Sequence, residues 1–105
     1  MALYGIYGSH TTESCPLNNI QVRNIVLKVA QDIDDIANKN KIKILDQYHS
    51  PLEHTFLWTV DAENSHSVEQ FMIESQWAVF NALRIVPIGR YQNVIEMLRQ
   101  VDSHL

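Results

Sequence analysis

The chain has 105 residues, of which 46% are hydrophobic and 19% charged, so we expect a single domain, residues 1–105, with one modest core. Its formal net charge of -4 and its eight scattered Lys and Arg residues exclude the clustered basic surface that nucleic-acid binding requires. The sequence has no leader pattern and no apolar run long enough to span a membrane, so the expectation is a cytoplasmic protein with neither nucleic acid nor membrane as partner.

The first third of the chain is predicted to hold a strand and a long helix. Residues 2–9 (ALYGIYGS) are aromatic and aliphatic and precede a polar stretch, which predicts a strand that ends near His10. Pro16 is typical of a first helical position, with Cys15 as the cap. Apolar residues then recur at helical spacing up to the NKNK turn, at Val22, Val26, Val29, Ile33 and Ile36.

Residues 41–62 are predicted to form a β-hairpin. KIKILDQYH, from Lys41, alternates at its start like a strand, SPL is typical of a turn, and EHTFLWTVDA predicts a third strand antiparallel to the second. Asn64 or Ser65 is the expected N-cap of a second helix, which carries Val68, Phe71 and Met72 on one side.

The end of the chain is predicted to add a strand and a short helix. VFNALRIVPI, from Val79, predicts a fourth strand, and residues 90–105 predict a helix with Val94, Met97, Leu98 and Val101 as its apolar stripe. This order is a split βαββαβ arrangement with a C-terminal helix, which is an α+β fold. Right-handed crossovers then give a four-stranded antiparallel sheet in the order 4-1-3-2, with both long helices on one face.

The other face of this sheet needs a cover, because the third and fourth strands carry apolar residues on both sides. Leu57 alternates with Phe56, Trp58 and Val60, and in the fourth strand Leu83 and Ile85 alternate with Ala82, Val86 and Ile88. Two copies that stack their open faces would bury this surface, so we expect a homodimer or a dimer of dimers. The alternative is that the C-terminal helix covers the face within one chain.

The order of elements and the segment SPLEHTFLWTVDAENSHSVEQFM, residues 50–72, resemble the ferredoxin-like dimeric α+β barrels. This superfamily includes small antibiotic-biosynthesis-type monooxygenases, YCII-like proteins and several uncharacterised families. The resemblance covers nearly the whole chain. It implies a small ligand, a haem or a metal held between sheet and helices or inside a dimeric barrel, and it does not choose among these chemistries.

Several metal-ligating residue types are expected at one edge of the sheet. His10, His49, Glu53 and His54 lie at the ends of the first three strands, and Cys15 leaves from the same edge. Imidazole and thiolate are ligands that zinc and copper prefer, so we predict a transition-metal site for zinc, copper or iron. Its favoured ligands are His10, Cys15 and His54, with His49 or Glu53 as an optional fourth. The alternative is exposed loop histidines beside a tight turn.

Strand alternation divides these residues between the two faces. If Ile42 and Ile44 face the helices, His54 points to the helix side together with Cys15. The same alternation places His49 and Glu53 on the opposite face.

Cys15 also has a second interpretation as a reactive thiol. As the cap of a helix it would lie at the positive end of the helix dipole, which favours the thiolate. With His10 or His54 as base it could act as a nucleophile or a redox thiol. The alternative is a small buried hydrophobe, and because Cys15 is the only cysteine, no disulfide can form within the chain.

Two further functions therefore stand beside metal binding. One is a small cofactor-free enzyme of the monooxygenase or isomerase kind, with an apolar pocket between sheet and helices and a histidine as acid or base. In that case Arg84 could bind a ligand carboxylate, although pairing with Glu53 or Asp46 is the simpler role. The other is a structural or regulatory assembly module. The aromatic residues either line such a pocket or form plain core, and they are Tyr4, Tyr7, Tyr48, Phe56, Trp58, Trp77 and Phe80.

Overall fold

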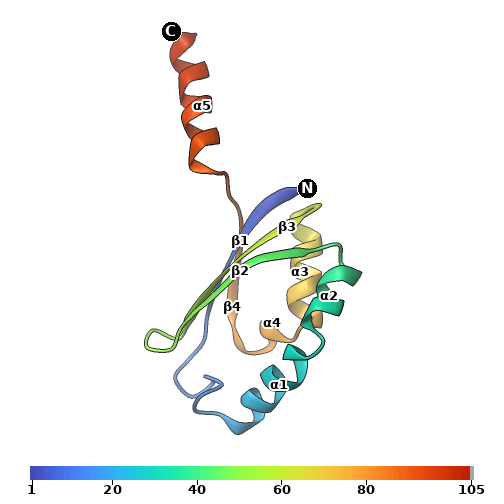
Figure 1. Cartoon of the computed structure of the whole chain (residues 1–105). Coiled ribbons are helices and arrows are strands. Elements are labelled where there is room, and N and C mark those ends of the chain that lie inside the picture. The colour runs from blue at the N-terminus through green and yellow to red at the C-terminus, as the bar shows by residue number, and fades with distance from the viewer. Residues whose placement is uncertain (105) are drawn as a thin grey trace.

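The computed structural model describes residues 1–104 and shows, within them, one four-stranded sheet and five helices (Figure 1). In chain order the elements are β1 (Ala2–Ser9), α1 (Ile20–Ala30), α2 (Ile33–Lys39), β2 (Lys43–Ser50), β3 (Thr55–Ala62), α3 (Ser65–Glu74), α4 (Trp77–Phe80), β4 (Ala82–Pro87) and α5 (Tyr91–Ser103). None of the helices in this part of the chain is both long enough and apolar enough to cross a membrane.

The sheet is open and antiparallel throughout, with the strand order β2-β3-β1-β4. Counted from β4, this is the order 4-1-3-2 that the sequence predicts. The α+β class and the four antiparallel strands are confirmed, and the arrangement is compatible with a ferredoxin-like fold.

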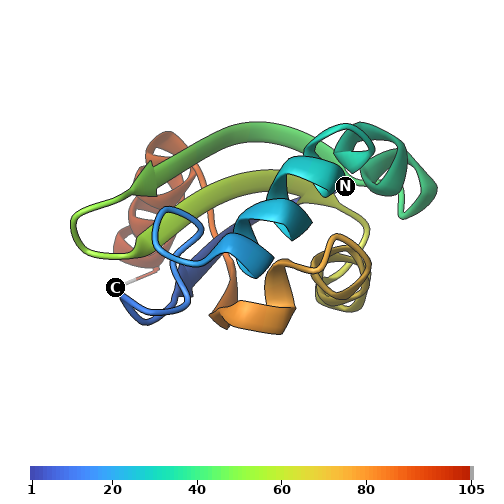
Figure 2. The same cartoon turned by 90° about the horizontal axis from the view of Figure 1, so that it is seen from below.

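The core lies between one face of the sheet and the helices. Phe56, Trp58 and Val60 alternate along β3 with less buried residues, and all three point to the helix side. They pack against apolar residues of α2, α3 and α4, among them Ala37, Val68, Phe71, Met72 and Trp77. Figure 2 shows α1, α3 and α4 on the same side of the sheet. Phe56 and Trp58 of β3 are therefore core, as one of the two interpretations predicts, and Trp77 of α4 is partly buried against them.

The long helix predicted from Pro16 to Ile36 is wrong in its start and in its continuity. Helix α1 begins at Ile20, because Asn19 caps it. The Val22 backbone N–H donates a 3.0 Å hydrogen bond to the Asn19 side chain. Asparagine is a much better N-cap than cysteine. After Ala30 the backbone tightens to i→i−3 hydrogen bonds, and a separate helix α2 follows.

Two predicted strand boundaries are also wrong. Val79 and Phe80 belong to the short helix α4, and the fourth strand begins only at Ala82. Short apolar runs fit a helix or a strand equally well, which explains this error. His54 lies in the β2–β3 turn rather than in the third strand. By contrast Asn64 caps α3 as predicted, through its side chain and the Ser67 backbone N–H at 2.9 Å.

The second face of the sheet is more polar than the sequence suggested. Tyr7, Tyr48 and Leu57 lie there, but Thr59 and Asp46 share the same face and are joined by a 2.8 Å hydrogen bond. Helix α5 does not cover this face, because it projects away from the sheet (Figure 1). None of residues 91–103 is buried. The C-terminal helix therefore provides no cover within this chain, and Leu105, the predicted last residue of that helix, lies outside the described residues.

Candidate metal centre

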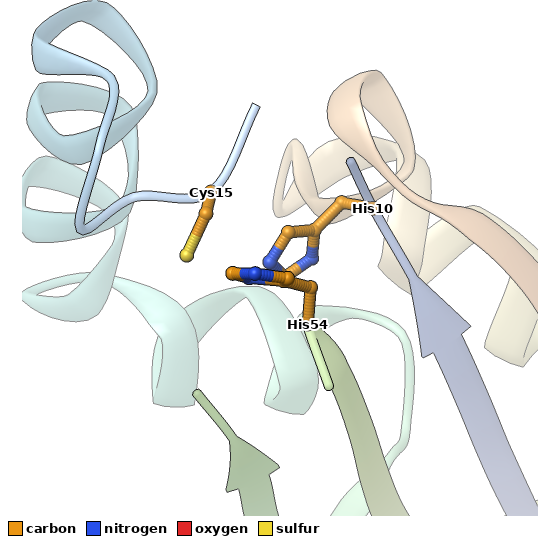
Figure 3. A group of neighbouring side chains, drawn as sticks. All are labelled: His10, Cys15 and His54. Atoms are coloured by element: carbon orange, nitrogen blue, oxygen red, sulfur yellow. The ribbon is translucent and has the colours of Figure 1, made fainter. Parts of the chain in front are cut away.

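Three side chains from separate segments meet at one end of the sheet. His10 follows the last residue of β1, Cys15 lies in the turn that precedes α1, and His54 ends the β2–β3 turn. One potential ligand atom from each of the three lies within 4.8 Å of the other two. Figure 3 shows the Cys15 sulfur and the two imidazole rings turned toward one another.

The backbone ties the two histidines together. The His10 N–H donates to the His54 carbonyl at 3.0 Å, which extends the β1–β3 ladder beyond the Ser9 and Thr55 pair. The His54 N–H donates in turn to the Ser50 carbonyl at 2.9 Å, and His54 has a left-handed backbone with φ of 59°. This conformation is uncommon for residues other than glycine, although histidine adopts it more readily than most. Such strain is retained at functional sites when the surrounding structure enforces it.

The turn that carries Cys15 is held by hydrogen bonds to its carbonyls. The N–H groups of Asn18 and Asn19 both donate to the Cys15 carbonyl, at 2.8 and 2.9 Å. The Arg23 guanidinium donates to the carbonyls of Pro16 and Leu17 at 3.0 and 3.1 Å. These contacts hold the segment in place, and the Cys15 side chain is fully buried, with 0% exposure.

Asn81 fixes the orientation and the tautomer of His10. Its side-chain N–H2 group donates to the Trp77 carbonyl at 3.0 Å, so its oxygen faces His10, where the Nδ1 atom lies 2.8 Å away. The His10 Nδ1 must therefore carry the proton that it donates, and the neutral ring presents an unprotonated Nε2. Metal-ligating histidines are held by this kind of second contact in most sites.

Two imidazole nitrogens of the clustered histidines have no hydrogen-bond partner within the described residues. His10 Nε2 and His54 Nδ1 are buried and make no hydrogen bond within the described residues. A buried polar atom without a partner costs free energy, and such atoms are rare in folded proteins. Both histidines belong to the group of ligand atoms that includes the buried thiol, so an occupant that accepts the lone pairs of these nitrogens would remove this cost.

The spacing of the three ligand atoms is close to that of a metal site. Zinc bonds of about 2.0–2.3 Å in tetrahedral geometry separate the ligand atoms by roughly 3.3–3.7 Å. The ligand atoms lie at most 4.8 Å apart, so each distance between them has to shorten by roughly 1.5 Å at most when a metal binds. Side-chain rotation can supply such a movement.

His49 lies on the helix side of the sheet, and the prediction that it points to the opposite face is wrong. A β-bulge causes the difference: Ile44 pairs with Val60, but Asp46 rather than Leu45 pairs with the next residue of β3. The extra residue reverses the alternation of β2 from that point on. His49 consequently pairs with Phe56, in the row of β3 that faces the helices.

The ring of His49 stacks on that of His10, with 5.5 Å between the ring centroids. Although the side chain is exposed as a whole, partial burial lowers the pKa of His49, and repulsion from His10 and then from His54 lowers it further. These effects favour the neutral form of His49, whose ring lies at the edge of the cluster against His10.

Glu53 lies in the exposed β2–β3 turn, outside the group of converging ligand atoms. Its backbone N–H donates to the Ser50 hydroxyl at 3.3 Å. The structure thus brings together His10, Cys15 and His54, adds His49 at the edge, and leaves Glu53 in the turn.

The structure also bears on the predicted roles of Cys15 as a helix cap and of Arg84 as an ion-pair partner. Cys15 lies before α1 and does not cap it, so the predicted position of its thiol at the helix N-terminus is wrong. Arg84 stacks over the Tyr7 ring, 5.3 Å from its centroid. Within residues 1–104 it forms no ion pair with Glu53 or Asp46, contrary to the simpler role predicted for it.

Comparison with known proteins assigns no chemistry to this cluster. No protein-family model, no curated protein and no solved structure matches the chain. What the site can do must therefore be inferred from its own side chains.

Proposed function

We propose that the protein binds a transition metal ion through His10 Nε2, Cys15 Sγ and His54 Nδ1. One observation carries the proposal: one ligand atom each from His10, Cys15 and His54 lies within 4.8 Å of the other two, and both histidines also hold a buried ring nitrogen that has no hydrogen-bond partner within the described residues. The two histidines come from separate segments of the chain. The backbone hydrogen bond from the His10 N–H to the His54 carbonyl holds these segments together, which supports the proposal further. A metal bound here would also join β1, the Cys15 turn and the β2–β3 turn.

The donor set favours zinc or copper over harder cations. One thiolate and two imidazoles suit zinc and copper, whereas magnesium and calcium prefer carboxylate and carbonyl oxygens. Three protein ligands leave a fourth tetrahedral position for a water molecule or for His49. Because Cys15 is fully buried, the site is better suited to holding a metal for sensing or storage than to reaching a large substrate.

Cobalt can report on this ligand set directly, because Co²⁺ takes zinc sites and its bond to a thiolate absorbs in the near ultraviolet. Titration of metal-free protein with Co²⁺ should give a saturating thiolate band that His54→Ala weakens strongly. His66→Ala is the matched control, since His66 is an exposed histidine in α3, outside the cluster. A wild-type titration without a thiolate band, or equal losses in the two variants, would refute the proposal.

A second candidate is favoured by the contact between His10 and Asn81. A thiol, an imidazole and an amide in this order form the nucleophile, base and orienting group of a thiol hydrolase or transferase. Against it stands the 0% exposure of Cys15, which leaves no path for a substrate to the sulfur. Iodoacetamide separates the two candidates: the thiol enzyme requires Cys15 to alkylate faster than a free model thiol, and the metal site requires slow alkylation that zinc slows further.

We also propose that the fold belongs to the ferredoxin-like dimeric α+β barrels. The strand order β2-β3-β1-β4 and the placement of the helices against one face support this assignment. Membership would make the homodimer the working state of the protein. The contact between two copies would involve α5, none of whose residues is buried within its own chain.

A further inference from the structure

Helix α5 is amphipathic but has no surface of its own chain to pack against. Its apolar stripe is exposed along its whole length, with relative exposures of 77% for Tyr91, 42% for Val94, 63% for Met97, 58% for Leu98 and 62% for Val101. The opposite side of the helix is polar, with Gln92, Glu96 and Arg99. Stripes of this kind normally face a core or a partner.

The open face of the sheet carries a hollow of about 650 Å³ that also lacks a cover. Its lining combines aromatic and aliphatic side chains with hydroxyl groups and one guanidinium group, and includes Tyr7, Tyr48, Leu57, Arg84, Ser9 and Thr55. Because it is concave and largely apolar, it is suited to receive apolar side chains from a helix.

The position of the hollow disfavours its own α5 as the occupant. The hollow lies toward the end of the sheet where Ser9 pairs with Ala82, whereas α5 leaves from the opposite end, after Pro87. Only residues 88–90 join β4 to α5, and the Ile88 N–H is still bonded to the Leu3 carbonyl at 3.0 Å. The helix therefore continues away from the sheet (Figure 1), where a second molecule can meet it.

Charge at the two surfaces is complementary. Arg84 is exposed on the open face and has no carboxylate partner within residues 1–104. Asp102 borders the apolar stripe of α5, next to Val101. A helix seated with its stripe on the hollow offers Asp102 at the border of the contact as a carboxylate for Arg84.

We propose that α5 of one molecule docks on the open sheet face of a second copy, and that the second copy returns the same contact. Such an exchange is a closed twofold arrangement, so it satisfies both unpartnered surfaces in each molecule and forms no chain of molecules. The proposal does not depend on metal binding.

Single charges introduced on the two sides of α5 test the proposal. Wild-type protein should sediment at about twice the 12.1 kDa chain mass at micromolar concentration. Leu98→Glu should raise the dimer dissociation constant roughly 30-fold or more, whereas Gln92→Glu on the polar side should leave it unchanged. Far-ultraviolet circular dichroism checks that both variants keep their fold. A monomeric wild type, or a dimer that Leu98→Glu leaves intact, would overturn the proposal.

Disulfide trapping identifies the occupant of the hollow. One copy carries Met97→Cys, and a second copy, made longer by a tag, carries Tyr48→Cys. Mixing them under mild oxidation should give a cross-linked heterodimer, because Cys15 is buried and does not compete. The pair Glu96→Cys and Tyr48→Cys is the control, since Glu96 lies on the polar side of α5. If instead one chain with Met97→Cys and Tyr48→Cys closes on itself as a monomer, α5 covers its own sheet and the proposal is wrong.

Discussion

Replacing Asn81 tests whether the metal site depends on the orientation of His10. In Asn81→Leu a side chain of similar size removes the 2.8 Å contact to His10 Nδ1 and the 3.0 Å contact to the Trp77 carbonyl. The His10 ring then has no partner that fixes its tautomer, so Nε2 presents its lone pair to the metal for only part of the time. The three proposed ligands remain in place.

The expected loss of metal affinity can be bounded from other metal sites, in which hydrogen-bond partners orient the ligating histidines. Loss of such a partner typically costs about 10- to 100-fold in metal affinity. This corresponds to about 1.4 to 2.7 kcal/mol of binding free energy. The lower bound is close to the net value of one partly buried hydrogen bond, about 0.5 to 1.5 kcal/mol.

Asn81→Asp is the matched variant, because it loses the same bond to the Trp77 carbonyl but keeps an oxygen for His10. Competition with a chromophoric chelator gives the zinc affinity of the three proteins. Asn81→Leu should bind zinc about 10- to 100-fold more weakly, and Asn81→Asp should bind about as tightly as wild type or more tightly. Equal affinities in the two variants would show that the contact to His10 does not support metal binding.

Three further predictions concern stability. The lowered pKa of His49 means that the unfolded chain binds more protons below the ordinary value of 6.5, so metal-free protein should lose stability as the pH falls through and below about 6.5. His49→Gln should flatten this dependence in urea midpoints measured between about pH 5 and pH 8, and a profile identical to wild type would contradict the cause given. Gly8→Ala should cost roughly 1–3 kcal/mol, because its Cβ would overlap the Phe56 ring, whereas Gly89→Ala meets only Val94 at 3.9 Å and should be tolerated. Zinc at about 100 times its dissociation constant should raise the melting temperature by about 10–20 °C in wild type and by little in Cys15→Ser, and equal shifts in both would exclude Cys15 as a ligand.

The order of the strands could be predicted because it depends on coarse features of the sequence. Apolar runs separated by turn residues define the strands, and the right-handed crossover leaves few ways to arrange them. The same reasoning places His10, His54 and Cys15 at one end of the sheet. It needs no knowledge of side-chain contacts.

The finer features depended on signals that the sequence does not carry. Ile44 and Leu45 are consecutive apolar residues, and nothing in them marks the bulge that turns His49 toward the helices. Asn81 is 71 positions from His10, so no local spacing connects the two. The Cys15–Pro16 pair is typical of a helix start, but a better cap stands four positions later at Asn19.

The position of α5 could not be predicted from the sequence either. Its apolar stripe predicts burial without naming the surface that buries it. No residue of α5 within 91–103 is buried, which is why we propose for this helix a role in assembly rather than in the core.

The metal content of the purified protein tests the central claim most directly. Protein prepared without a histidine tag or chelator, loaded with zinc and freed of excess by gel filtration, is measured by elemental analysis together with His54→Ala and His66→Ala. The account predicts close to one zinc ion per chain in wild type and in His66→Ala, and little in His54→Ala. Wild-type protein that emerges without metal, or a His54→Ala variant that retains as much zinc as wild type, would contradict it.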